Sequence, residues 1–213
     1  LEQDTNERQS ENLGDIKRRS LAGIGALFRR QVIIKASFFL GNIVLARILS
    51  PDVFGIYDIV SFVVQFFSLV GDVGLGAALI RNRSQPRAEE LASTFWTQQA
   101  LVWSIAALVF ALAPLALLVY PSLPTVGVWL IRAMAVSMIL MSFKTVPAIL
   151  LERDLAFDRI ARVDIAENLS YQVAAVVLAL LGFGVWSFIF AALVRGVVGN
   201  VMIYSITSWR PSF

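Results

Sequence analysis

The sequence contains no cysteine and no histidine. Their absence excludes disulfide bonds, thiolate catalysis, imidazole metal sites and histidine acid–base chemistry. Charge is also scarce, because Asp, Glu, Lys and Arg make up 15% of the 213 residues while hydrophobic residues make up 58%. Soluble domains carry about 25% charged residues. We therefore expect a membrane protein without a metal centre or a cofactor.

The apolar residues fall into six runs of twenty residues or more, the length that a helix needs to cross roughly 30 Å of hydrocarbon. We expect an all-α polytopic membrane bundle of about six transmembrane helices in residues 23–213. Residues 1–22 form a polar tail that lacks the apolar segment of a signal peptide. Because the first residue is Leu1 and not Met, we expect a piece of a longer gene product. The predicted spans are 27–49, 54–80, 91–120, 126–151, 160–181 and a sixth that ends near 208.

Proline and glycine divide these runs. Pro51 ends the first span, since the residue before a proline avoids helix. Pro147, near the end of the fourth span, leaves a carbonyl without its usual donor, so a kink or a neighbouring helix must satisfy it. The turn at 182–184 is so short that the last two spans must lie antiparallel.

Basic residues in the connections are strongly asymmetric. Only Arg47 falls on one side of the predicted bundle. Because cytoplasmic loops retain positive charge, we expect both termini to be cytoplasmic, and we read the net charge of +3 as membrane orientation and not nucleic-acid binding. The residues on the basic side are Lys17, Arg18, Arg19, Arg29, Arg30, Arg81, Arg83, Arg87, Arg153, Arg159, Arg162 and Arg210.

Four basic residues fall inside the predicted spans, where a charge at mid-bilayer costs about 2.5 to 3.5 kcal/mol. Lys35 lies about two turns into the first span, and Arg195 lies near the middle of the sixth. Arg132 and Lys144 lie in the outer and inner halves of the fourth. They predict a cationic cavity that holds an anionic group, with Lys35, Lys144 and Arg195 as contacts and Arg132 as a secondary one.

A plainer interpretation of these four residues stays open. Basic side chains close to a span end extend to the headgroups, which would explain Lys35, Arg132 and Lys144 equally well. Arg195 lies too deep for that, and its alternative is a buried ion pair with a carboxylate expected in the cytoplasmic half of the bundle. The candidate carboxylates are Asp72, Asp164 and Glu167.

Glycines gather in the second and sixth spans, where small residues permit close contact between helices. We interpret them as packing positions, with a hinge for alternating access as the alternative. They are Gly71, Gly74, Gly76, Gly196 and Gly199.

Several stretches resemble the polysaccharide flippases of the multidrug/oligosaccharidyl-lipid/polysaccharide (MOP) exporter superfamily, over about residues 24–213. The first motif is fairly specific. The stretches are LARILSPDVFGIY (45–57), GDVGLGAALI (71–80), LERDLAF (151–157), LLGFGVW (180–186) and WRP (209–211).

The resemblance implies one lobe, the N-terminal one, of a transporter with two six-helix lobes around a cationic cavity. It implies translocation of a polyprenyl-pyrophosphate-linked oligosaccharide to the outer leaflet of a bacterial inner membrane. The expected partners are this lipid-linked substrate, membrane lipids and a second lobe, in the same chain or another. None of the four basic residues lies in the matching motifs.

Three other functions stay open. A cation-coupled multidrug antiporter of the same superfamily would use a buried carboxylate, and the expected shallow position of the acids argues against it. A membrane-embedded glycan polymerase would need a catalytic loop or domain, and the connections are short and lack its motifs. A helper subunit without transport activity is the third. We expect a transporter and not an enzyme.

Overall fold

Within the described residues, six helices are long and apolar enough to cross a membrane. The computed structural model describes residue 25, residues 28–71 and residues 87–211, and none of these residues forms a strand. The all-α, polytopic membrane architecture expected from the sequence is confirmed. The elements are the first helix (Phe28–Ile48), α2 (Pro51–Gly71), α4 (Ala88–Leu112), η1 (Ala113–Leu115), α5 (Ala116–Val119), α6 (Val126–Ser142), α7 (Thr145–Arg153), α8 (Phe157–Leu180) and α9 (Trp186–Ile206).

Three helices begin earlier than predicted, and one of them is α4, which starts at Ala88 and not at 91. α2 starts at Pro51 and not at 54, because proline fits the first helical position, where no N–H is needed. α8 starts at Phe157 and not at 160, and its polar first turn includes Asp158 at the positive end of the helix dipole. All three first turns contain acidic residues and are too polar to belong to an apolar run. The predicted end of the second span, residues 72–80, lies outside the described residues.

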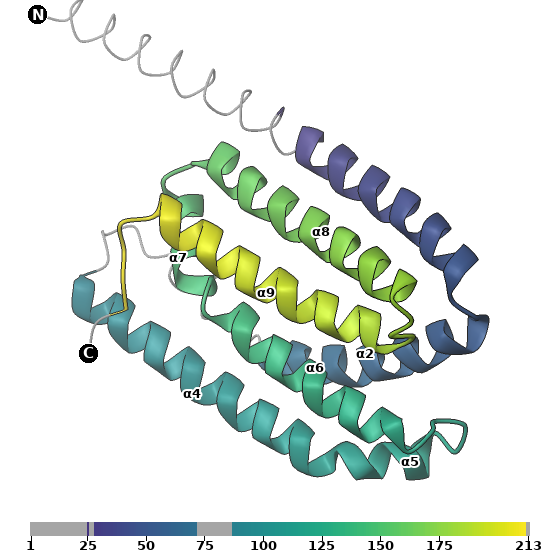
Figure 1. Ribbon diagram of the computed structural model, residues 1–213. Helices are drawn as coiled ribbons and strands as arrows, with labels where there is room; N and C mark the ends of the chain where they lie inside the picture. The colour runs from purple at the N-terminus through teal and green to yellow at the C-terminus, as the bar shows by residue number, and fades with distance from the viewer. Residues whose placement is uncertain (1–24, 26–27, 72–86, 212–213) are drawn as a thin grey trace, which may run out of the picture.

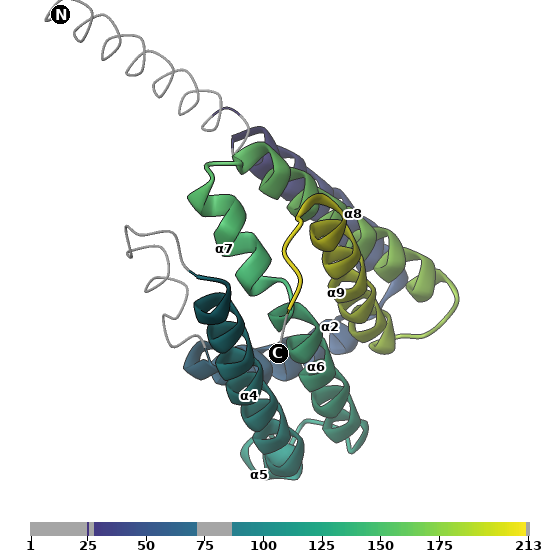
Figure 2. The same cartoon turned by 90° about the vertical axis from the view of Figure 1, so that its left-hand side faces the viewer.

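Across the molecule the helices pack against one another in the order α8, α9, α6 and α4, which is not their order along the chain (Figure 1). α8 contacts α9, α9 contacts α6, and α6 contacts α4, while α2 contacts both α4 and α6. The first helix lies along α8 in both views (Figures 1 and 2). Gly41 permits this contact, because a Cβ there would overlap the side chain of Gln172 on α8. The first helix, α8 and α9 thus form one side of the bundle, and α2, α4 and α6 form the other.

The turn between α8 and α9 confirms the predicted antiparallel pair. Gly182 and Gly184 have φ values of +84° and +56°, in the left-handed region that favours glycine. α8 and α9 therefore lie side by side over their length (Figure 1). This contact brings the polar residues of α8 against α9.

Apolar side chains fill the contacts between helices and also cover the outside. Val60, Leu130 and Ile189 are completely buried where α2, α6 and α9 meet. On the outside, Leu118 and Leu180 are more than two-thirds exposed. Such a surface suits lipid, in which each helix satisfies its own backbone hydrogen bonds.

The connections alternate between the two ends of the bundle. α7, the start of α8 and the end of α9 lie at one end, together with the starts of the first helix and α4, and the turn between α8 and α9 lies at the other (Figure 1). The first of these ends carries most of the described basic residues. That it faces the cytoplasm stays a prediction, and Arg81 and Arg83 lie outside the described residues. The described residues of the basic end are Arg29, Arg30, Arg87, Arg153, Arg159, Arg162 and Arg210.

Candidate functional site

The fourth span is broken between α6 and α7, and the break is held by α9. Pro147 has no N–H to donate to the carbonyl of Phe143, four residues earlier. The hydroxyl of Tyr204 donates to that carbonyl instead, at 2.9 Å. One turn earlier on α9, the side-chain amide of Asn200 donates to the carbonyl of Leu140 at 2.7 Å. The expectation that a neighbouring helix satisfies the freed carbonyl is confirmed.

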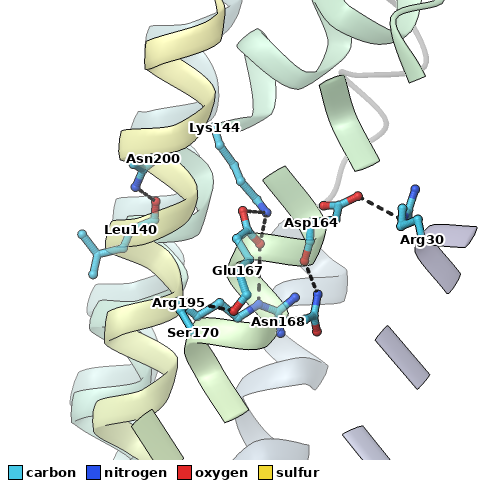
Figure 3. A network of polar contacts seen from close by, with 9 residues as sticks. All are labelled: Arg30, Leu140, Lys144, Asp164, Glu167, Asn168, Ser170, Arg195 and Asn200. Atoms are coloured by element: carbon cyan, nitrogen blue, oxygen red, sulfur yellow. Dashed lines mark hydrogen bonds and ion pairs between the residues drawn. The ribbon is translucent and has the colours of Figure 1, made fainter. Parts of the chain in front are cut away.

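Lys144 lies in this break, immediately before α7, and reaches Glu167 on α8 (Figure 3). Its Nζ donates to Oε1 and Oε2 of Glu167 at 2.5 and 2.6 Å. The Glu167 side chain is 1% exposed and that of Lys144 is 21% exposed. Burial of a carboxylate this deep is costly unless it is paired and hydrogen-bonded, and Lys144 provides that pairing.

Arg195, on α9, approaches the same carboxylate. Its Nε lies 3.6 Å from Oε2 of Glu167, too far for a hydrogen bond. The guanidinium makes no hydrogen bond within the part of the chain that the structure describes, and the side chain is 35% exposed. Arg195 therefore contributes charge to the cluster and keeps its donors unused. The ion pair with Glu167, one of the two interpretations of Arg195, is present.

Small residues on α9 make room for the cluster. A Cβ at Gly199 would overlap the Glu167 carboxylate, and one at Gly196 would lie 2.9 Å from Cβ of Leu140. Both glycines therefore serve close packing, the interpretation favoured from the sequence. Gly71 ends α2, whereas Gly74 and Gly76 lie outside the described residues, as does Asp72.

A second ion pair lies next to the cluster, toward the basic end (Figure 3). Nε of Arg30 on the first helix is 3.1 Å from Oδ2 of Asp164 on α8. The side chain of Asn168 donates to the backbone carbonyl of Asp164 at 2.8 Å. The positive charge of Arg30 and the negative charge of Asp164 cancel. Two cations face the single carboxylate of Glu167, so the charges sum to +1.

The four predicted basic residues do not form one group. The structure brings Lys144 and Arg195 together on Glu167. Lys35 is exposed on the first helix and makes no hydrogen bond or ion pair with the rest of the described chain. Arg132 lies about 18 Å before Lys144 along α6 and α7 at about 1.5 Å per residue, and it contacts Phe110 on α4. The proposed site therefore narrows to Lys144 and Arg195.

Glu167 is one of the three carboxylates that the sequence offered as partners of Arg195, and the two side chains meet. Asn200 and Tyr204 were not identified as site residues. The sequence does contain a signal that could have identified Asn200 and Tyr204, because they share one face of the helix with the glycines at 196 and 199. Among the described residues no three acidic side chains lie close enough to hold a metal ion.

The fold and the charge cluster define the class of protein. Six membrane-spanning helices with ionised groups buried between them are typical of integral membrane proteins that move a polar solute.

The comparisons with known proteins place the chain within this class. It belongs to the polysaccharide biosynthesis protein family, which matches residues 44–213. It is 34% identical over 171 residues to the succinoglycan biosynthesis transport protein ExoT of Rhizobium meliloti (strain 1021), over 80% of this chain and 34% of the relative. The chain thus spans about a third of the length of the curated relative that it matches. No solved structure matches it. The family match includes Lys144, Glu167 and Arg195, and it excludes Arg30 and Lys35.

Proposed function

We propose that this chain forms one lobe of a membrane transporter that moves a polyprenyl-pyrophosphate-linked oligosaccharide from the cytoplasmic to the outer leaflet by alternating access. A second lobe, in the same chain or in another, supplies the other half of the pathway. Residues 23–213 form the lobe, residues 1–22 are its tail, and both termini face the cytoplasm of a bacterial cell. Lys144 and Arg195 contact the pyrophosphate.

The observation that carries this proposal is the pair of cations on one buried carboxylate. A pyrophosphate that leaves water loses hydration, and basic side chains offset that loss through charge-assisted hydrogen bonds. Glu167 neutralises one of the two cations. The remaining charge and the unused donors of Arg195 are available to an anion.

The break between α6 and α7 supports the same assignment. Transporters commonly bind their substrates beside discontinuous helices, whose ends carry partial charges and unpaired backbone groups. Here Lys144 lies in the break itself, and α7 begins at the next residue. The family membership supports the polysaccharide side of the proposal, since the relative is named for the transport of succinoglycan.

Replacement of Arg195 by Ala in the complete transporter tests the proposal. Glu167 keeps Lys144 as its partner, so the protein should insert and accumulate normally while polysaccharide export is lost. Lipid-linked oligosaccharide should accumulate in the cytoplasmic leaflet, which an added glycosidase can sample in inside-out vesicles. Arg162→Ala is the matched control, because Arg162 is an exposed arginine paired with Asp158 at the basic end. Unchanged export in the Arg195 variant would exclude the assignment.

One observation favours a second candidate, a cation-coupled multidrug antiporter. Glu167 is nearly inaccessible, and such antiporters exchange ions at a deep carboxylate. Its two cationic partners argue against this function, because they already neutralise it. Export of an organic cation driven by a proton or sodium gradient, and abolished by Glu167→Gln, would favour the antiporter.

A further inference from the structure

A second feature lies away from the cluster, in a groove between α4 and α6. The groove has a volume of about 320 Å³. Its walls are apolar, apart from one arginine, and four of the lining residues are alanines that leave it open along the two helices. The lining includes Trp103, Ala106, Ala107, Phe110, Arg132 and Ala135.

Arg132 is fixed at the rim by the backbone of α4. Pro114 has no N–H for the carbonyl of Phe110, four residues earlier, and Nε of Arg132 donates to that carbonyl at 3.3 Å. The guanidinium also lies 4.6 Å from the Phe110 ring centroid and 5.0 Å from that of Trp129. Its two terminal nitrogens make no hydrogen bond within the described chain. Arg132 is thus held in place through Nε, while its two terminal nitrogens are available to donate to a ligand.

The depth of Arg132 matches that of lipid phosphates. α6 and α7 together cover 28 residues, Val126–Arg153, about 42 Å at about 1.5 Å per residue. Although the span is broken between α6 and α7, this length along the chain is close to the thickness of a bilayer with its headgroups, roughly 40–45 Å around a hydrocarbon core of about 30 Å. Arg132 follows Val126 by about 9 Å, close to the boundary between headgroups and hydrocarbon. Trp129, which is 59% exposed, lies near this boundary, as interfacial tryptophans do.

We propose that Arg132 and the groove bind an anionic phospholipid, at the end of the bundle opposite the basic end. The terminal nitrogens of Arg132 donate to the lipid phosphate, a geometry that arginine matches with two parallel hydrogen bonds. One acyl chain lies in the groove against Ala107 and Phe110. An anionic lipid is favoured over a zwitterionic one, because a zwitterionic headgroup carries its own cation. This site does not depend on the proposed transport function.

Native mass spectrometry of the detergent-purified protein, titrated with phosphatidylglycerol or phosphatidylethanolamine of the same acyl chains, tests the proposal. Phosphatidylglycerol should be retained preferentially. Arg132→Gln, which can still donate to the Phe110 carbonyl, should reduce its retention about tenfold, because a charge-assisted hydrogen bond is lost. Arg159→Gln is the control, because it removes an exposed arginine at the other end of the bundle and should leave retention unchanged.

A second variant tests the groove without changing Arg132, so a local disturbance caused by Arg132→Gln cannot explain its result. Ala107 is exposed in the groove, so Ala107→Phe should fill the acyl position and reduce retention while Arg132 stays in place. Equal retention of the two lipids, or retention that neither variant reduces, would overturn the proposal. Preferential retention of a prenyl phosphate over phosphatidylglycerol would also overturn it, by assigning the groove to a different lipid.

Discussion

Proline interrupts two of the spans, α4–η1 at Pro114 and α6–α7 at Pro147, and each leaves one carbonyl without its helical donor. At Pro147 the donor is Tyr204, a neutral hydroxyl on α9. At Pro114 it is Arg132, whose cation lies against two aromatic rings at the lipid-facing surface. Both prolines leave a backbone carbonyl that needs an external donor, and the residues that surround each carbonyl differ, so the donors differ.

The two breaks differ in whether a charged side chain donates to the backbone carbonyl. In the α6–α7 break a neutral donor serves the backbone, so the charge of Lys144 is left for Glu167. In the α4–η1 break the cation itself serves the backbone, and the groove beside it is apolar. The first break therefore belongs to a buried ion cluster inside the bundle, and the second belongs to the lipid boundary.

Removal of Glu167 should have the largest effect on stability. Glu167→Ala leaves Lys144 and Arg195 without their carboxylate in a buried site, which should lower the free energy of unfolding by about 3–5 kcal/mol. Reversible unfolding in mixed micelles measures this. Asp158→Ala is the matched control, because Asp158 lies on the same helix in an exposed ion pair with Arg162, and it should cost at most about 0.5 kcal/mol. Similar losses in the two variants would show that the cluster is not a buried one.

Addition of a methyl group at Gly199 should have the next largest effect. The new Cβ would overlap the Glu167 carboxylate, which Lys144 holds in place, and overpacking of this kind costs about 1–3 kcal/mol. Gly55→Ala is the control, since nothing lies within 4 Å of a Cβ there, and it should stabilise α2 by about 0.5–1 kcal/mol. Destabilisation by Gly55→Ala comparable to that by Gly199→Ala would contradict the claim that close contact with Glu167 requires glycine at 199.

Double-mutant cycles at the two prolines should show the smallest effects and the sharpest contrast. Tyr204→Phe should cost about 1 kcal/mol, and Pro147→Ala should remove most of that cost by restoring the N–H that the Phe143 carbonyl lacks. The cycle of Arg132→Met, which removes the donor to the Phe110 carbonyl, with Pro114→Ala should give a coupling below about 0.5 kcal/mol, because water and headgroups reach this break. Equal coupling energies would mean that the surroundings do not distinguish the two breaks.

Hydropathy predicted all six spans and the antiparallel α8–α9 pair, because span length and the glycine turn are local properties. Pro147 likewise predicted that α6–α7 would need an external donor. The identity of that donor, Tyr204, was not predictable from these signals, since hydropathy does not determine how a helix is rotated about its axis.

The same limit applies to the candidate site. The sequence offered Asp72, Asp164 and Glu167 as partners of Arg195 without a choice among them, because hydropathy does not determine which face of α8 lies against α9. Arg195 and Glu167 come from different helices, and their contact depends on Gly199 facing α8. The grouping of Lys144 with Arg195, and the separation of Arg132 from both, therefore required the three-dimensional structure.

Binding of a polyprenyl pyrophosphate to the purified complete transporter tests most directly whether the cluster is a binding site as well as a structural ion pair. The comparison is between the unaltered protein, Arg195→Gln and Arg195→Lys. We expect Arg195→Gln to weaken binding about tenfold or more, because a hydrogen-bonded charge is lost, with the fold preserved by the Lys144–Glu167 pair and binding partly restored by Arg195→Lys. Unchanged affinity in a folded Arg195→Gln protein would contradict the account.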